Sequence, residues 1–473
     1  MSGVNVASAK DELESAAGMA AAVRARGVSA GELVERALER IERLDGPVNS
    51  CVRVLADEAR ADARRIDSGR ERERELLGVP VTVKEIFDVR GERTTWGCPG
   101  LRDAPPAQRD DPHVARLREA GAIVVARTNV PELSCWGHTD NPVYGETRNP
   151  RDPSRTPGGS SGGAAASVAL GIAPLGLGSD AGGSVRVPAS FCGVVGLKPS
   201  FATLPADAAA QVNRLNCAGV LAGSVSDAAL ALRVLSSERG PAAAPPAGDA
   251  APATGAPPLA PRGTRIGATV DHGFAPVEPE VRDAFAAALE RLAAAGLEAR
   301  PADPPPRSPL PFIVPVLECE VYEAFADVLE GGDHGLSDAT LAVVNVAQGV
   351  SGRDYVRALG ERLAFEAQWR EFFRSWDVLV SPTTLVTAFG LGRTAPEHVD
   401  GHRIDPVADG DWYPTCFIAN VLGAPAISIP CGVDGDGLPI GMQLMGRPGE
   451  DALVLAVAAA AERSLIHQSR ESL

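Results

Sequence analysis

The spacing of apolar and polar residues predicts alternating helices and strands along this chain. Residues 11–70 are expected to be helical, because apolar residues recur at helical spacing after a capping box that begins at Ser29. A continuous apolar run at 78–83 predicts a short buried strand, and 122–126 predicts another strand after a helix at 111–117. This strand–helix–strand order indicates an α/β fold with a parallel or mixed sheet faced by helices.

The second half of the chain continues this pattern after one low-complexity segment. Residues 240–263 are rich in Pro and Ala and predict a surface insertion. We expect one domain over 1–473. Its parts are a helical segment at 1–70, a core at 77–230 and a smaller, largely helical subregion at 264–473. The remaining predicted elements are helices at 164–170, 279–295 and 313–376, and strands at 174–178, 264–270, 379–381 and 426–430.

Composition and charge narrow the function classes. The 473-residue chain has a formal net charge of −16, which argues against nucleic acid or an anionic membrane as a partner, because phosphate binding needs clustered Lys and Arg. The chain opens on polar residues, and the apolar run at 453–461 is too short to span a bilayer, so we expect a cytoplasmic protein. Its 8 cysteines form no C-x-x-C pair and its 7 histidines lack zinc-binding spacing, so neither a metal nor another cofactor is expected.

Two serines in glycine-rich surroundings, Ser160 and Ser184, are candidates for nucleophilic catalysis. A serine becomes a nucleophile when a base takes its proton and N–H groups stabilise the oxyanion that forms. Glycines let backbone N–H groups approach a ligand closely. Lys84 ends the apolar run upstream. A lysine there is most often a solvated surface residue, but a desolvated lysine would have a lowered pKa and could act as the base.

A phosphate-binding loop is the main alternative for the glycine-rich stretch at 157–186. It is disfavoured because no Gly-Lys-Ser/Thr ends either loop and no G-x-G-x-x-G opens a dinucleotide-binding unit. A purely structural pair of glycine turns is the second alternative, and the two serines in register make it less attractive.

The order and spacing of the lysine and the two serines resemble the amidase signature family. The resemblance covers about residues 20–462, outside the Pro- and Ala-rich segment. The matching stretches are GVPVTVKEIFDV at 78–89, ARTNVPEL at 126–133, YGETRNP at 144–150, PGGSSGG at 157–163, LGSDAGGSVRVPASFCGVVGLKP at 177–199 and GLPIGMQLMGRP at 437–448. The resemblance implies the amidase-signature fold, a mixed central β-sheet covered on both faces by α-helices.

The resemblance also implies a Ser–cis-Ser–Lys triad. Carried over, Ser184 is the nucleophile, Ser160 the bridging serine and Lys84 the base, with the cis peptide bond between Gly159 and Ser160. The implied activity is hydrolysis of a small carboxamide through an acyl-enzyme on Ser184.

Residues around the triad have supporting roles in the same scheme. Asp180 and Arg186 are expected to form an ion pair that braces the nucleophile's loop, and Ser161 is expected to position that loop. The oxyanion hole is expected to consist of the backbone N–H groups of Ala181, Gly182, Gly183 and Ser184.

Substrate-binding residues are the least constrained by these motifs. The candidates are Gly159, Trp136 and Tyr144, and the aromatic residues within 130–145 and 313–420 suggest an apolar acyl pocket. The expected partner is a small-molecule amide, and self-association as a homodimer is left open.

Three alternatives to a stand-alone amidase remain from the sequence. An amidotransferase subunit that releases ammonia from glutamine looks similar, but its Arg-Gln-Pro is replaced here by Arg186-Val187-Pro188 and its long Tyr-Gly-Arg segment is missing. An enzyme that transfers the acyl group to an amine would pass through the same acyl-enzyme. An inactive binding module is disfavoured because all three triad residues are present.

Overall fold

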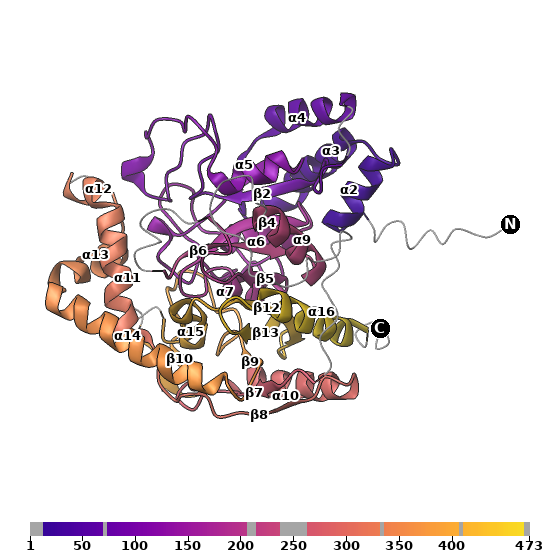
Figure 1. The fold of residues 1–473 in the computed structure, drawn as a ribbon. Helices are drawn as coiled ribbons and strands as arrows, with labels where there is room; N and C mark the ends of the chain where they lie inside the picture. The colour runs from indigo at the N-terminus through magenta and orange to yellow at the C-terminus, as the bar shows by residue number, and fades with distance from the viewer. Residues whose placement is uncertain are drawn as a thin grey trace.

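An 11-stranded mixed sheet forms the centre of the structure (Figure 1). The structure is a computed structural model that describes residues 13–69, 73–205, 214–236, 263–331, 335–405 and 410–467. In spatial order the strands are β1 (Cys51–Val54), β3 (Ile123–Thr128), β2 (Pro80–Lys84), β4 (Leu175–Asp180), β6 (Cys217–Ala222), β5 (Val195–Lys198), β12 (Ala426–Val433), β13 (Pro439–Gly446), β9 (Val378–Pro382), β7 (Ile266–Ala268) and β8 (Ala299–Pro301). Strand β2 runs parallel to both of its neighbours, and so does β7, while the other pairs are antiparallel. The predicted α/β class with a mixed sheet is confirmed.

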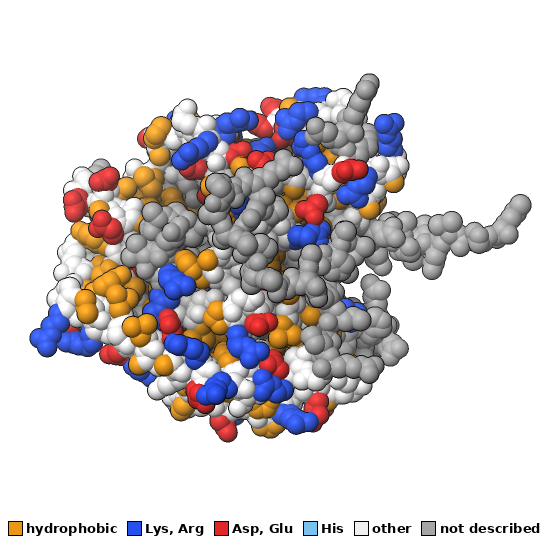
Figure 2. All heavy atoms as spheres, in the orientation of Figure 1, with side chains coloured by type: hydrophobic (Ala, Val, Ile, Leu, Met, Phe, Trp, Pro, Cys, Tyr) orange, Lys and Arg blue, Asp and Glu red, His pale blue; other side chains and the backbone are white. Residues whose placement is uncertain are grey.

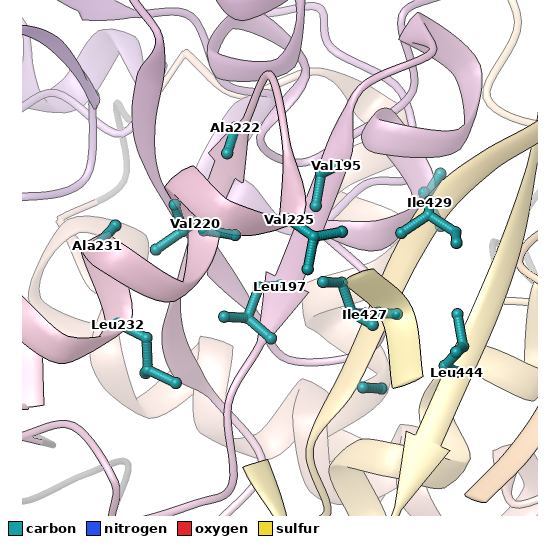
Figure 3. Packing of buried hydrophobic residues seen from close by; sticks show 14 of the residues in the cluster. Val195, Leu197, Val220, Ala222, Val225, Ala231, Leu232, Ile427, Ile429 and Leu444 are labelled. Carbon is teal, nitrogen blue, oxygen red and sulfur yellow. The ribbon is translucent and has the colours of Figure 1, made fainter. Parts of the chain in front are cut away.

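Helices cover both faces of this sheet. In chain order they are α2 (Ala16–Arg24), α3 (Ala30–Arg40), α4 (Ala56–Ser68), α5 (Pro112–Glu119), α6 (Gly162–Ala169), α7 (Arg186–Cys192), α9 (Val225–Ser236), α10 (Pro279–Ala294), α11 (Leu310–Ala324), α12 (Ala326–Glu330), α13 (Asp338–Gly349), α14 (Gly352–Phe372), α15 (Pro414–Leu422) and α16 (Asp451–His467). Alternate side chains of a strand point to opposite faces. Leu221 of β6 accordingly clusters with Ala164 of α6, whereas Val220 and Ala222 join the other cluster with Ala231 of α9 (Figure 3).

Most predicted elements form close to their predicted positions. The capping box forms, since the Ser29 hydroxyl accepts a hydrogen bond from the Glu32 N–H at 3.1 Å and the Glu32 carboxylate accepts one from the Ser29 N–H at 2.7 Å. The strand predicted at 78–83 is β2, and the helix predicted at 111–117 is α5, with Asp111 as its N-cap.

The helical prediction for residues 11–70 is wrong at Cys51–Val54, which form β1. This edge strand pairs antiparallel with β3, and Cys51 lies opposite Thr128. The strand conformation of these four residues depends on pairing with β3, which lies far along the chain. Because the four residues are partly exposed, their own sequence gives little indication of a strand. The Pro- and Ala-rich stretch predicted at 240–263 lies outside the described residues, except for Gly263.

Helices α11 to α14 form a layer beside the sheet, at the left of Figure 1. Helix α11 packs against α13, α14 and α15. Figure 2 shows hydrophobic side chains gathered on this side, where Val346, Val356 and Leu363 of α13 and α14 are exposed. Across the described ranges, no helix combines the length and apolar character needed to cross a lipid bilayer.

Candidate active site

The carboxyl ends of three parallel strands meet at one edge of the sheet. Strand β2 lies between β3 and β4 and runs parallel to both. The three strands end at Lys84, Thr128 and Asp180. Ligands of open α/β sheets bind outside the carboxyl ends of the strands. The loops that leave this edge hold the candidate catalytic residues.

Lys84 is buried at this edge. Its side chain is 0% exposed, and Nζ donates hydrogen bonds to the hydroxyls of Ser160 at 2.7 Å and Ser179 at 2.9 Å. Burial lowers the pKa of Lys84 to about 7, although the charge of Asp180 acts to raise it. A large share of the lysine is therefore neutral near neutral pH, as a general base requires. The alternative of a solvated surface lysine is wrong.

Ser160 lies beside Lys84, just before α6, and the peptide bond between Gly159 and Ser160 is cis. Its hydroxyl accepts a second hydrogen bond, at 2.9 Å, from the hydroxyl of Ser134. With two bonds accepted, the Ser160 hydroxyl still has its own proton to donate. Sequence reasoning missed Ser134. The available signal was its position after β3, at the sheet edge where β2 also ends.

Ser184 lies in the loop between β4 and α7 and is partly exposed, unlike the buried Lys84 and Ser160. Its carbonyl accepts a hydrogen bond from the Ser161 N–H at 3.0 Å, which joins the two serine loops. The Ser161 hydroxyl in turn donates to the carbonyl of Ser179 at 3.2 Å. Within the described structure the Ser160 and Ser184 hydroxyls are not hydrogen-bonded to each other. Such catalytic contacts often tighten only when substrate is bound.

The backbone around Ser184 offers N–H groups to a ligand. The Gly183 N–H already donates to the Asp180 carboxylate at 2.8 Å. Among the described residues no acceptor is found for the N–H groups of Ala181, Gly182 and Ser184. These three are free to donate to a ligand oxygen, and the role of all four N–H groups in an oxyanion hole stays a prediction.

Two glycines of the serine loops are required by close contacts. A Cβ on Gly159 would lie 2.2 Å from the carbonyl oxygen of His138, and a Cβ on Gly182 would lie 2.3 Å from the ring of Phe417. Neither backbone segment leaves room for a side chain, so both positions need glycine.

A buried ion pair fixes the loop that carries Ser184. Asp180 and Arg186 are both 0% exposed, and the Arg186 guanidinium donates to both carboxylate oxygens, at 2.8 and 3.0 Å. Burial alone would raise the pKa of Asp180, but the charge and hydrogen bonds of Arg186, together with smaller contributions from other neighbouring groups, hold this pKa below its usual range. Arg186 also donates to Asn420 at 2.6 Å and Gln443 at 2.5 Å. The loop is thereby tied to α15 and β13.

A cavity of about 210 Å³ lies beside Ser184. Apart from the residues next to Ser184, the wall of this cavity is mainly apolar. Most of it comes from α11 and from the segment that leads into α15. The lining residues are Ser134, Cys135, Trp136, Ala181, Gly182, Ser184, Leu310, Val314, Leu317, Glu318, Val321, Val343, Gly410, Asp411, Tyr413 and Phe417. The structure thus brings Trp136 into the same cavity as Ser184. Gly159 does not line it.

Tyr144 lies in a different place from the other candidates. It lines a second cavity, together with Arg53 and Arg127, and its hydroxyl donates to the Glu85 carboxylate at 3.3 Å. The structure therefore does not bring Tyr144 to Ser184.

Glu132, which sequence reasoning did not select, attaches the helical layer to the catalytic edge. Its buried carboxylate accepts hydrogen bonds from the Ser337 N–H at 3.0 Å and from the Thr340 hydroxyl at 2.6 Å, at the start of α13. The Thr340 hydroxyl also accepts from the Trp136 indole N–H at 3.0 Å. These bonds fix the cavity wall at Trp136 relative to α13.

The mixed sheet, with two glycine-rich serine loops and a buried lysine at one edge, has the architecture of the amidase signature enzymes, which hydrolyse the carbon–nitrogen bonds of amides. The chain belongs to this family, since the family model named Amidase matches residues 32–455.

Relatives of the chain carry different names. A glutamyl-tRNA(Gln) amidotransferase subunit of Koribacter versatilis is 33% identical, with 94% of this chain and 97% of that protein covered. An acylamidase of Rhodococcus erythropolis is also 33% identical, with 94% of each chain covered. The crystal structure of a bacterial aryl acylamidase superposes with a TM-score of 0.86 at 28% identity, covering 95% of this chain and 96% of that one.

Asp180→Asn should destabilise the protein, because it leaves the buried Arg186 without its counter-charge. Breaking a buried ion pair by removing one partner costs about 3–5 kcal/mol. The matched control is Asp400→Asn, in the exposed Arg282–Asp400 pair, where we expect a loss below about 1 kcal/mol. Urea unfolding of both variants measures the difference. Equal unfolding midpoints for Asp180→Asn and the wild type would contradict the structural role of the ion pair.

Proposed function

We propose that this protein is an amidase that hydrolyses a small carboxamide through an acyl-enzyme on Ser184, releasing a carboxylic acid and either ammonia or an amine. The observation that carries this proposal is the 2.7 Å contact between the fully buried Lys84 Nζ and the Ser160 hydroxyl. A lysine with a pKa of about 7 can take a proton from a serine that has a second serine close by.

The first half of the reaction forms the acyl-enzyme. Lys84 accepts the Ser160 proton, Ser160 accepts the Ser184 proton, and Ser184 Oγ bonds to the amide carbon. The N–H groups of Ala181, Gly182 and Ser184 stabilise the resulting oxyanion. The carbon–nitrogen bond then breaks as Ser160 gives a proton to the leaving nitrogen, and Lys84 returns its proton to Ser160.

The second half releases the acid. Water attacks the ester carbon, and its proton passes to Lys84 through Ser160. The bond between Ser184 Oγ and the acyl carbon breaks as Ser184 regains a proton from the same relay. Two serines and one lysine can in this way hydrolyse an amide without a histidine.

The charge of the cavity favours this function over glutamine hydrolysis by an amidotransferase subunit. Glutamine carries an α-carboxylate, and a buried carboxylate needs a cationic or hydrogen-bonding partner. The described residues that line the cavity include two carboxylates, Glu318 and Asp411, and no Lys, Arg or His. The α-carboxylate of glutamine would therefore find no cationic partner among these residues.

Ser184→Ala should abolish amide hydrolysis, because no acyl-enzyme can form. We expect a loss of more than about 10³-fold in kcat, measured as ammonia or amine release across aliphatic, aryl and amino-acid amides. The exposed Ser68→Ala is the control and should keep wild-type activity. Substantial hydrolysis by Ser184→Ala, or a folded wild type that neither turns over any amide nor is labelled by a fluorophosphonate, would refute the proposal.

Ser160→Ala should impair amides more than activated esters, because only an amide nitrogen needs a proton to leave. We expect a loss of about 100-fold or more on an amide, and a clearly smaller loss on the p-nitrophenyl ester of the same acid. Steady-state kinetics on the matched amide and ester give the two ratios. Equal losses would show that Ser160 does not deliver the leaving-group proton.

The rate on an uncharged amide should rise with pH and level off above about pH 7, because only neutral Lys84 accepts a proton. Below its pKa of about 7, kcat/KM should fall about tenfold for each pH unit. The profile is measured on an alkanamide, whose own charge does not change. A flat profile below pH 7, or a rate that falls as pH rises, would remove Lys84 as the base.

A further inference from the structure

One carboxylate stands out among the otherwise apolar α11 residues that line the Ser184 cavity. Glu318 follows Leu317 on α11, and it lines the cavity together with Leu310 and Val314. Its Oε2 atom is buried and accepts no hydrogen bond from any described residue. A buried acceptor without a partner costs free energy, and a charged one costs more.

The described residues that line the cavity offer no positive charge to pair with the Glu318 carboxylate. The described lining residues contain no Lys, Arg or His, and the second charged group, Asp411 at the exposed rim, is also negative. Burial raises the pKa of Glu318 to about 7 with no opposing contribution from a cation. A partner supplied by a ligand would satisfy both the charge and the hydrogen-bonding capacity of the group.

Glu320, two residues further along α11, differs in its surroundings. One of its carboxylate oxygens is also buried without a hydrogen bond. Burial raises its pKa to about 8, but the charge of Arg362 acts against this shift. Glu320 does not line the cavity. The helix therefore holds two unsatisfied carboxylates, of which only Glu318 lies in the same cavity as Ser184.

We propose that Glu318 binds a positively charged amino group of the substrate, so that the amide hydrolysed here carries an alkyl chain that ends in an amine. This proposal rests on the proposed amidase function and adds the substrate class to it. The apolar side chains of Leu310, Val314 and Leu317 contact the chain, and Glu318 pairs with the ammonium group. The carboxamide then lies against Ser184 and the N–H groups of Ala181 and Gly182.

The test compares matched substrates. A series of ω-aminoalkanamides of increasing chain length is paired, one by one, with the alkanamides in which a methyl group replaces the ammonium group. At the chain length that fits, wild-type enzyme should prefer the amine by about 10- to 100-fold in kcat/KM, as expected for a charged hydrogen bond. No preference at any length would overturn the assignment of the substrate class.

Three variants of the two carboxylates locate the effect. Glu318→Gln should lower kcat/KM for the amine by about 10-fold or more and leave the methyl counterpart nearly unchanged. Glu318→Leu should go further and raise kcat/KM for the methyl counterpart, a gain that misfolding cannot produce. Glu320→Gln removes the same charge from the same helix and should change neither substrate. Equal losses on both substrates in Glu318→Gln, or an equal effect of Glu320→Gln, would overturn the role of Glu318.

Failure of this proposal is distinguishable from failure of the amidase function. Hydrolysis of the uncharged alkanamides, and its loss in Ser184→Ala, tests the function without Glu318. If no amide is hydrolysed, calorimetric titration with n-alkylammonium ions still tests Glu318. The ions should bind the wild type about 10-fold more tightly than Glu318→Gln, and equal binding would overturn the proposal.

Discussion

The buried ion pair between Asp180 and Arg186 is the interaction on which the site depends. It fixes the loop that carries Ser184, and its outer contacts are Asn420 of α15 and Gln443 of β13. Asn420 also donates to the Asp180 carbonyl and carboxylate, both at 3.0 Å. Two charges can remain in a region without solvent only if nearly all their hydrogen-bonding positions are filled. The conformation of the loop therefore depends on residues more than 200 positions away in the chain.

The same ion pair is coupled to the lysine at the neighbouring strand end. Burial favours neutral Lys84, while the charge of Asp180 favours the ammonium form, and the balance puts the pKa at about 7. Burial and the charge of Asp180 on the adjacent strand thus set the protonation state that the proposed reaction requires.

Sequence analysis predicted those parts of the candidate site that depend on local sequence patterns. The apolar run that ends at Lys84 and the glycines around Ser160 and Ser184 are visible in a single chain, and the resemblance supplied their roles. The contacts of Glu132 and Ser134 could not be predicted from local sequence, because their partners come from the start of α13 and from the loop before α6. Tyr144 is a case in which the sequence misled: it belongs to a matching motif close to Ser160 in the chain, but it lines a different cavity from Ser184. β1 was missed for the same reason as Ser134: its conformation depends on a distant partner.

The junction between Glu132 and α13 has a consequence for how such enzymes diversify. The candidate catalytic residues lie at the sheet edge, whereas much of the cavity wall belongs to the α11–α14 layer. Glu132 and Trp136 link the two through Ser337 and Thr340. Mutations on the inner face of α11 can reshape the wall while the reacting groups keep their positions. A lineage can therefore explore new amides by drift in one helical layer, under strong selection only at the few residues that attach it.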